Sequence, residues 1–137
     1  MAEGDPVVER WDTSRMKIDP CSTSLAGGKA KLLTTALRRD AAKYVGNYDL
    51  KVSPYFFKNE KGTLSIDVSD EALRKLARGT VVDFAGRAVT SGTGKSRAVK
   101  VKVTPGGSGV ANGNMTISIA TTNGELVFST EYAFFGG

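Results

Sequence analysis

Hydrophobic and polar residues alternate most regularly in residues 79–106, and this stretch sets the expected fold class. A period of two places successive side chains on opposite faces of a pleated strand. Valines share one face of the second arm and lysines share the other: Val99, Val101 and Val103 against Lys100 and Lys102. The two arms are joined by Ser-Gly-Thr-Gly-Lys-Ser, a composition typical of a turn. The stretch therefore predicts an antiparallel hairpin with one buried and one solvated face.

The same alternation predicts further strands along the chain. These are residues 48–58, where Pro54 indicates an edge strand or a bend, and residues 63–68, 115–120 and 126–134. Asn123-Gly124 is the strongest hairpin-turn signal. Between the strands, Ser69 is expected to cap a short helix that ends at Gly79.

Residues 29–45 predict a helix, because Leu33, Leu37 and Ala41 follow helical spacing and Gly46 suits a helix end. A pair of strands is the rival interpretation, since residues 44–48 also resemble a turn. Residues 1–28 have the composition of an irregular arm with one isolated Trp11.

The fold class that follows is mainly β, or β-rich α+β. We expect an antiparallel sheet, sandwich or barrel-like, of about six strands with one or two helices packed against it. The expected organisation is an N-terminal arm over residues 1–28 and a single β-rich domain over residues 29–137, a length that suits one domain.

The composition limits the chemistry. The chain has no histidine, which excludes Ser-His-Asp and Cys-His triads and imidazole metal sites. Cys21 is the only cysteine and is expected to be an inert thiol. We therefore expect no catalytic set, no metal and no cofactor. Carboxylates remain as the basis of an alternative enzymatic function, but nothing in the sequence shows that any two converge; they are Asp67, Asp70, Asp83, Glu125 and Glu131.

Residues 91–96 resemble the end of a phosphate-binding P-loop. That loop needs a glycine where this chain has Val89, and a helix where the pattern after Ser96 predicts a strand. A plain hairpin turn is the better interpretation.

Charge is segregated along the chain. The net charge is +5, and no acidic residue occurs from Phe84 to Gly124, whereas acids dominate the first twenty residues. The hairpin carries the candidate anion-binding residues Arg87, Lys95, Arg97, Lys100 and Lys102. Their clustering indicates a surface that attracts anions, although edge lysines also serve to prevent strands from pairing with other chains. Tyr55 and Phe57 form a candidate aromatic platform.

These features predict a non-enzymatic binding or assembly module, whose basic hairpin face takes an anionic polymer, a polysaccharide or a protein partner. A nucleic-acid-binding β domain is a lower-ranked alternative, because the aromatic residues lie in other strands and the acidic arm opposes binding. The C-terminal Gly136-Gly137 resembles the tail of ubiquitin-like modifiers, which implies a further alternative, although Phe134 and Phe135 read as strand.

No run is apolar enough to predict a transmembrane segment. The Gly-, Thr- and Ser-rich composition favours an exported or cell-surface protein whose signal peptide is absent from this sequence, and a cytoplasmic location is the other interpretation. Association through edge strands is a further expectation.

Overall fold

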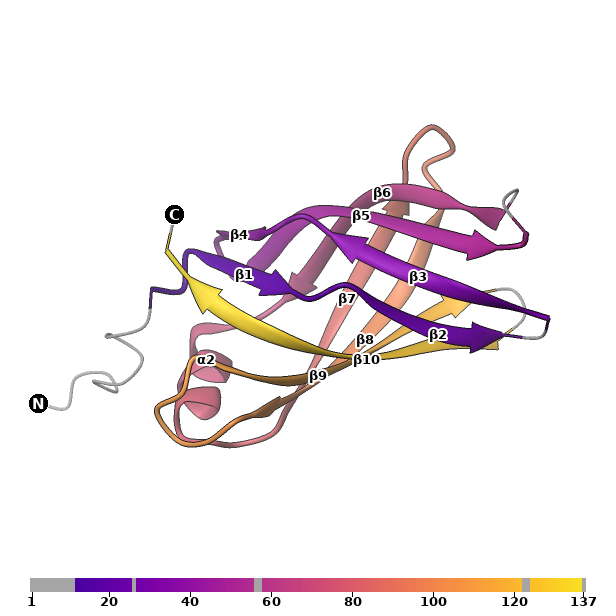
Figure 1. The fold of residues 1–137 in the computed structure, drawn as a ribbon. Helices are drawn as coiled ribbons and strands as arrows, with labels where there is room; N and C mark the ends of the chain where they lie inside the picture. The colour runs from indigo at the N-terminus through magenta and orange to yellow at the C-terminus, as the bar shows by residue number, and fades with distance from the viewer. Residues whose placement is uncertain (1–11, 26, 56–57, 122–123, 137) are drawn as a thin grey trace, which may run out of the picture.

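An antiparallel sheet closes on itself to form a barrel in the computed structural model, which describes residues 12–25, 27–55, 58–121 and 124–136 (Figure 1). Within these residues the sheet has ten strands, where the sequence predicted about six, and one short helix. The mainly β fold class with an antiparallel, barrel-like sheet is confirmed. The strands are β1 (Arg15–Ile18), β2 (Cys21–Leu25), β3 (Gly28–Thr34), β4 (Leu37–Asp40), β5 (Lys43–Ser53), β6 (Glu60–Asp67), β7 (Val82–Thr90), β8 (Ser96–Pro105), β9 (Asn112–Thr121) and β10 (Gly124–Phe135).

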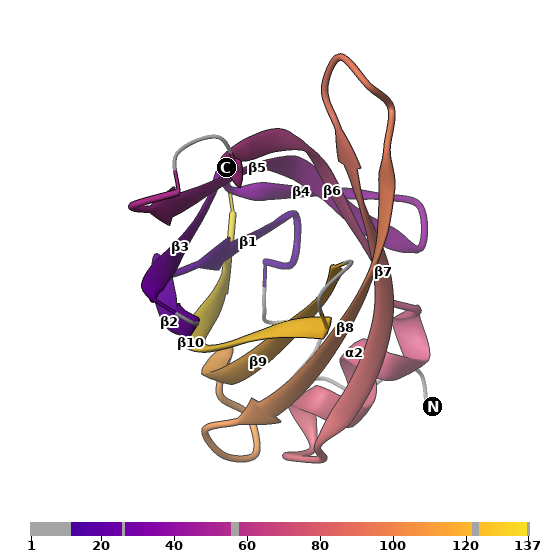
Figure 2. The same cartoon turned by 90° about the vertical axis from the view of Figure 1, so that its right-hand side faces the viewer.

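The ring follows the order of the chain. Strands pair in the order β2-β3-β5-β4-β1-β10-β9-β8-β7-β6, and a further pairing of β5 with β6 closes the ring. The register of β1 on β4 continues that of β2 on β3: Met16 faces Leu37, and Cys21 faces Leu32. Each of these two pairs of short strands therefore acts as one bent strand. The result is an up-and-down barrel, in which chain neighbours are also neighbours in space (Figure 2).

Residues 29–45, predicted as a helix, form β3, β4 and the start of β5, so the helix prediction is wrong and the rival strand interpretation is confirmed. Ala30 and Leu32 are buried while Lys29 and Lys31 are exposed, which is the period of a strand. Tertiary pairing on both sides thus overrides helical propensity. Residues 1–28, predicted as an irregular arm, contain β1 and β2; Trp11 lies outside the described residues.

The inward side chains fill the barrel. The largest of the fully buried side chains come from six strands and the helix: Tyr44, Phe128, Leu32, Leu37, Ile66, Leu76, Met115 and Ile117, with Val99, Val101 and Val103 of the predicted valine face beside them. The alternations predicted for β8, β9 and β10 are confirmed by this burial. Burial of the valine face turns Lys100 and Lys102 to solvent.

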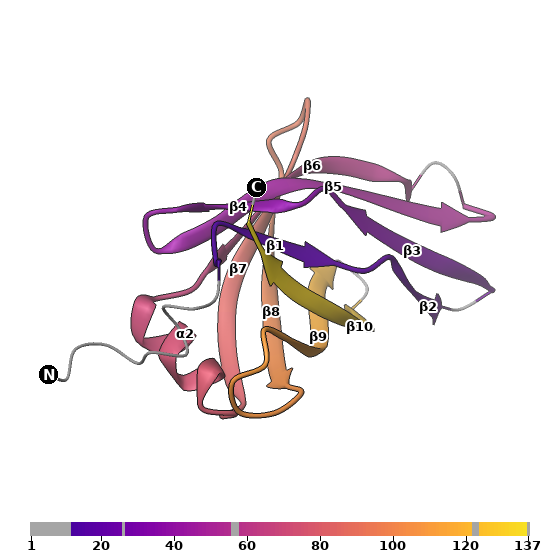
Figure 3. The same cartoon turned by 60° about the vertical axis from the view of Figure 1, so that its left-hand side comes forward.

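The helix α2 (Asp70–Ala77) covers one end of the barrel, on the side of β4 and of the loop between β8 and β9 (Figures 1 and 3). The Ser69 hydroxyl accepts a hydrogen bond from the Ala72 amide at 3.1 Å, which confirms the predicted cap. Leu73 and Leu76 belong to this helix and are buried. The Gly109 amide donates to the Ala77 carbonyl at 2.7 Å and ties the β8–β9 loop to the helix end.

Glycine allows two strands to approach closely where the barrel wall bends. A Cβ at Gly86 of β7 would lie 2.5 Å from the Ser65 carbonyl oxygen of β6, and one at Gly62 of β6 would overlap the Val89 carbonyl. Backbone cannot yield to such contacts as a flexible side chain can. These glycines keep β6 and β7 in register and set the position of the β7–β8 hairpin.

The described residues form no helix that is long and apolar enough to cross a membrane.

Candidate anion-binding face

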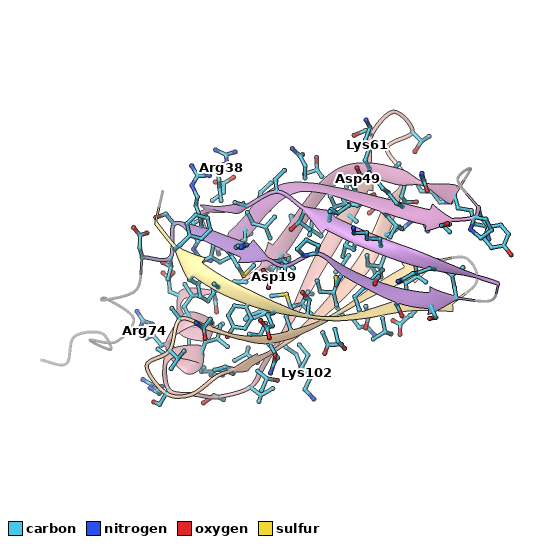
Figure 4. The ribbon with its side chains drawn as sticks, viewed as in Figure 1. Asp19, Arg38, Asp49, Lys61, Arg74 and Lys102 are labelled. Atoms are coloured by element: carbon cyan, nitrogen blue, oxygen red, sulfur yellow. The ribbon has the colours of Figure 1, made fainter. Side chains whose placement is uncertain are left out.

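The β7–β8 hairpin turns its charged side chains away from the core. Arg87 on β7 and Lys100 and Lys102 on β8 are exposed, alternating with the buried Val99 and Val101. In Figure 4, Lys102 extends from the lower side of the barrel. None of the three cations forms an ion pair with a described residue.

The register shows which side chains neighbour each cation. Arg87 stands between Ser65 and Ala98, and Lys100 stands between Ala85 and Ser118. Arg87 and Lys100 are diagonal neighbours on adjacent strands, so their Cβ atoms are about 7–8 Å apart. Small, uncharged neighbours leave both cations open to solvent and to an anion.

Asp83 is the one acid among the outward positions of β7, β8 and β9. It stands directly opposite Lys102 in the β7–β8 register. A carboxylate in this position partly offsets the charge of Lys102. No acid stands directly opposite Arg87 or Lys100 in the registers with their neighbouring strands.

Lys95 lies in the turn that joins β7 and β8, and it is exposed. The turn is closed by hydrogen bonds from the Thr90 amide to the Lys95 carbonyl at 2.8 Å and from the Gly94 amide to the Thr90 carbonyl at 2.9 Å. Gly92 and Gly94 have φ values of 89° and 70°, which glycine adopts readily. The hairpin projects beyond the rest of the ring (Figure 2), and Lys95 is the residue of its turn that directly precedes β8. The predicted turn, followed by a strand rather than a helix, is confirmed.

Arg97 does not join the exposed cations. The sequence suggested that it could reach outward from the end of β8, but its guanidinium turns inward and binds the Glu60 carboxylate. Nε lies 2.9 Å from Oε1 and Nη2 lies 3.0 Å from Oε2, and the two side chains are 16% and 13% exposed. The hydrogen bond to Glu60 raises the pKa of Arg97, and this effect outweighs the lowering that burial causes. This geometry does not suit an anion-binding role, because the Arg97 guanidinium is already paired with the Glu60 carboxylate.

Glu60 and Arg97 belong to a polar network at the end of the barrel opposite α2. The Tyr48 hydroxyl donates to Oε1 of Glu60 at 3.1 Å and lies 3.3 Å from the Thr90 hydroxyl. Burial raises the pKa of the Tyr48 phenol above its ordinary value. The network links β5, β6, β7 and β8 and closes this end with bonded polar groups. Its role in the fold is structural.

The predicted aromatic platform is not brought together by the described residues. Tyr55 is partly buried against the core, with the Lys58 ammonium 5.4 Å from its ring centroid. Phe57 lies outside the described residues.

The candidate carboxylates are distributed over the surface. Asp70 pairs with Arg39 at 2.8 Å, and Glu125 and Glu131 lie on the outer face of β10. Asp67 and Asp83 line one open depression of about 420 Å³ beside α2, and Lys43 stands directly opposite Asp67. No group of three or more metal-ligating side chains is found in the described parts of the chain.

A small cavity lies among the described core residues of the barrel. The cavity enclosed by core side chains beneath α2 has a volume of about 10 Å³, which is barely enough for one water molecule. Its lining is entirely apolar and includes Met16, Leu76 and Phe134. A cavity of this size cannot hold a ligand larger than a water molecule.

Cys21 is buried on β2 rather than placed in a loop, and burial raises the pKa of its thiol. A thiol that stays protonated and covered is a poor nucleophile, as the inert interpretation requires.

The sequence missed a second group of outward cations, on the strands formed by residues 15–53. Arg15 faces Arg38 across β1 and β4, and Lys31 faces Lys51 across β3 and β5. The alternation of Lys29, Ala30, Lys31 and Leu32 was the available signal, and the helical interpretation obscured it.

Comparisons of this chain with protein-family models, with curated protein sequences and with solved structures find no match.

Proposed function

We propose that this chain is a non-enzymatic binding module that holds an anionic polysaccharide on its β7–β8 hairpin. The hairpin face consists of Arg87, Lys95, Lys100 and Lys102. The observation that supports the proposal is charge placement: the outward positions of β7, β8 and β9 carry three exposed cations and a single acid, Asp83. A face with this imbalance attracts anions.

A polymer suits the hairpin face better than a small anion. The cations lie on a flat strand surface and at a projecting turn rather than in a pocket. Each exposed charge contributes little alone, because water and salt screen it. A chain of anionic groups can contact several of the cations at once, and their contributions then combine.

A polysaccharide suits the face better than a nucleic acid. Proteins that bind single strands combine basic grooves with aromatic rings on which bases stack. The outward positions of β7, β8 and β9 carry no aromatic residue, and Phe84 on β7 turns toward the core. Exposed lysines and an arginine without a stacking surface fit sulfate or carboxylate groups along a sugar chain.

Heparin retention at rising salt tests the proposal. Lys100→Gln with Lys102→Gln should elute at clearly lower salt than the parent, because two contacts with the polymer are lost. The matched control is Arg74→Gln with Lys75→Gln, which removes the same charge from the exposed side of α2. Asp83→Asn should shift elution to higher salt, because it removes the acid opposite Lys102.

Two results would contradict the proposal. Equal elution of the Lys100/Lys102 variant and the α2 control would show that net charge, and not the hairpin face, determines retention. Stronger retention on single-stranded DNA than on heparin would favour the nucleic-acid alternative.

A further inference from the structure

Two pairs of like charges face each other directly across the sheet. In the β1–β4 ladder Arg15 is the partner of Arg38, and in the β3–β5 ladder Lys31 is the partner of Lys51. All four side chains occupy outward positions; three are exposed and Arg15 is partly so. Directly opposite residues have Cβ atoms about 4.5–5.5 Å apart, and like charges at that distance destabilise the sheet.

The acids of the same strands stand directly opposite other lysines. Asp49 stands opposite Lys61, and Asp40 stands opposite Lys43. No ion pair joins any of the four paired cations to a described residue. The other neighbours of Lys31 and Arg38 are Ser22 and Val45. Neither cation pair thus has an acid directly opposite it, and the outward acids of the same strands, Asp40 and Asp49, lie two residues along from Arg38 and Lys51.

The cation pairs lie on the side of the barrel opposite the hairpin face. From β3 the ring passes β5, β6 and β7 before it reaches β8, and from β4 it passes β1, β10 and β9. In either direction around the ring, β8 is the fourth strand from the bent strand β3–β4, so the two lie on opposite sides of the barrel. Figure 4 shows the same separation, with Arg38 on the upper side of the barrel and Lys102 on the lower side.

We propose that the outer face formed by Arg15, Lys29, Lys31, Arg38 and Lys51, here called the N-terminal basic face, is a second binding site for an anionic polysaccharide. One sulfate or carboxylate group placed between two facing cations is attracted by both and offsets their mutual repulsion. The bound state thus removes a penalty that the free protein carries. Lys29, two residues from Lys31 on β3, extends the charged row.

The spacing of the two pairs requires a chain rather than a single anion. Lys31 and Arg38 are seven residues apart on the bent strand β3–β4, so they lie at most about 23 Å apart at 3.3 Å per residue. An extended polymer with anionic groups at both ends of that span reaches both pairs. Tyr44 and Tyr48, the aromatic residues of β5, are buried in the barrel. Phe135 of β10, which stands directly opposite Arg15, is the exposed aromatic ring that the described residues place beside this face. A single ring gives less stacking surface than the successive aromatic residues on which nucleic-acid bases stack, which favours a sugar polymer.

Together with the hairpin face, this site makes the barrel bivalent, a consequence that rests on the proposed function. A protein with binding faces on opposite sides can hold two polymer chains and cross-link them. The N-terminal basic face itself does not depend on the hairpin face, because the two share no residue.

Calorimetric titration with a size-defined heparin fragment of about 25 Å tests this inference. The unmodified chain should bind two fragments, whereas Lys31→Gln with Lys51→Gln should bind one, and so should Lys100→Gln with Lys102→Gln. The matched control is Lys43→Gln with Lys61→Gln, which removes the same charge from β5 and β6 at lysines that face acids. That control should still bind two fragments.

The outcomes separate the two sites. If the Lys31/Lys51 variant binds as the parent does, the N-terminal basic face is not a site, whatever happens at the hairpin. If only the Lys31/Lys51 variant loses binding, the inference stands and the proposed hairpin function fails. Tighter binding of single-stranded DNA than of heparin, lost in the Lys31/Lys51 variant, would overturn the polysaccharide assignment.

A folding control keeps the result interpretable. The Lys31/Lys51 variant removes a like-charge pair, so its melting temperature should equal or exceed that of the parent. Loss of the site at an unchanged or higher melting temperature supports a binding role. Loss of the site together with a fall of several degrees would count against it, and an Arg15→Gln with Arg38→Gln variant then repeats the test at the second pair.

Discussion

Arg97 and Glu60 form a two-point ion pair that joins β8 to β6 at the end of the barrel opposite α2. The two N–O distances are 2.9 and 3.0 Å, and both side chains are largely covered. The Arg97 guanidinium also lies 3.5 Å from the Ala120 carbonyl oxygen of β9. The pair thus connects three strands of the ring, and it takes Arg97 out of the basic surface.

Breaking this pair from one side should destabilise the fold. Arg97→Met leaves the Glu60 carboxylate covered and without its cation, and we expect a loss of about 2–3 kcal/mol in the free energy of unfolding. The double variant Arg97→Met with Glu60→Met should recover part of that loss, because no uncompensated charge remains. Urea unfolding of the single and double variants measures this. A double variant as unstable as Arg97→Met alone, or less stable, would contradict the expectation.

Two buried tyrosines should respond oppositely to loss of their hydroxyl groups. The Tyr44 hydroxyl donates to the Thr13 carbonyl at 2.8 Å, whereas the Tyr132 hydroxyl is buried without a hydrogen-bond partner among the described residues. Tyr44→Phe should therefore cost about 1 kcal/mol, and Tyr132→Phe should be neutral or slightly stabilising. Thermal unfolding of both variants shows which substitution costs more stability. The opposite order would show that the Tyr132 hydroxyl has a partner such as bound water.

The same tyrosines predict alkaline unfolding. Burial raises the pKa of both Tyr44 and Tyr132 to about 12, from an ordinary value near 10. The folded state therefore disfavours the phenolate, and the resulting stability is complete below pH 10 and lost as pH rises from about 10 to 12. We expect the melting temperature to fall across that window, together with late appearance of tyrosinate absorbance. A flat melting temperature up to pH 12 would contradict the burial of these rings.

The like-charge pair on β3 and β5 predicts a trade-off between stability and binding. Lys51→Glu places a carboxylate opposite Lys31 and should raise the free energy of unfolding by about 0.5 kcal/mol. The same change should weaken heparin binding, because it removes one cation and neutralises another. Paired unfolding and binding measurements check both effects. Reduced stability combined with unchanged heparin binding would rule out both halves of the prediction.

Local alternation was enough to predict the C-terminal half of the barrel. The valines of β8 and the sequence Ser69-Asp70-Glu71 before α2 are local signals that the structure confirms. Residues 29–45 were predicted wrongly, because Leu33 and Ala41 fit a helical spacing by coincidence. In the structure Leu33 is partly exposed on the outer face, and Ala41 lies in a tight turn with a φ of 54°.

The charged pairings were beyond local reasoning. Glu60 and Arg97 are 37 residues apart, and their contact depends on the registers of β6 on β7 and of β7 on β8. The facing of Lys31 and Lys51 likewise depends on the β3–β5 register. Sequence alternation indicates which side of a strand a lysine occupies, but it does not show which side chain faces it on the next strand.

The dependence of heparin affinity on salt, measured with the unmodified chain, tests the binding account most directly. Several exposed cations that contact a polyanion lose their attraction as the Debye length shrinks from about 10 Å at 0.1 M salt to about 3 Å at 1 M. We therefore predict clear binding at low ionic strength and a steep, continuous loss of affinity as salt rises. Absence of binding at low salt, or an affinity that salt leaves unchanged, would contradict the account.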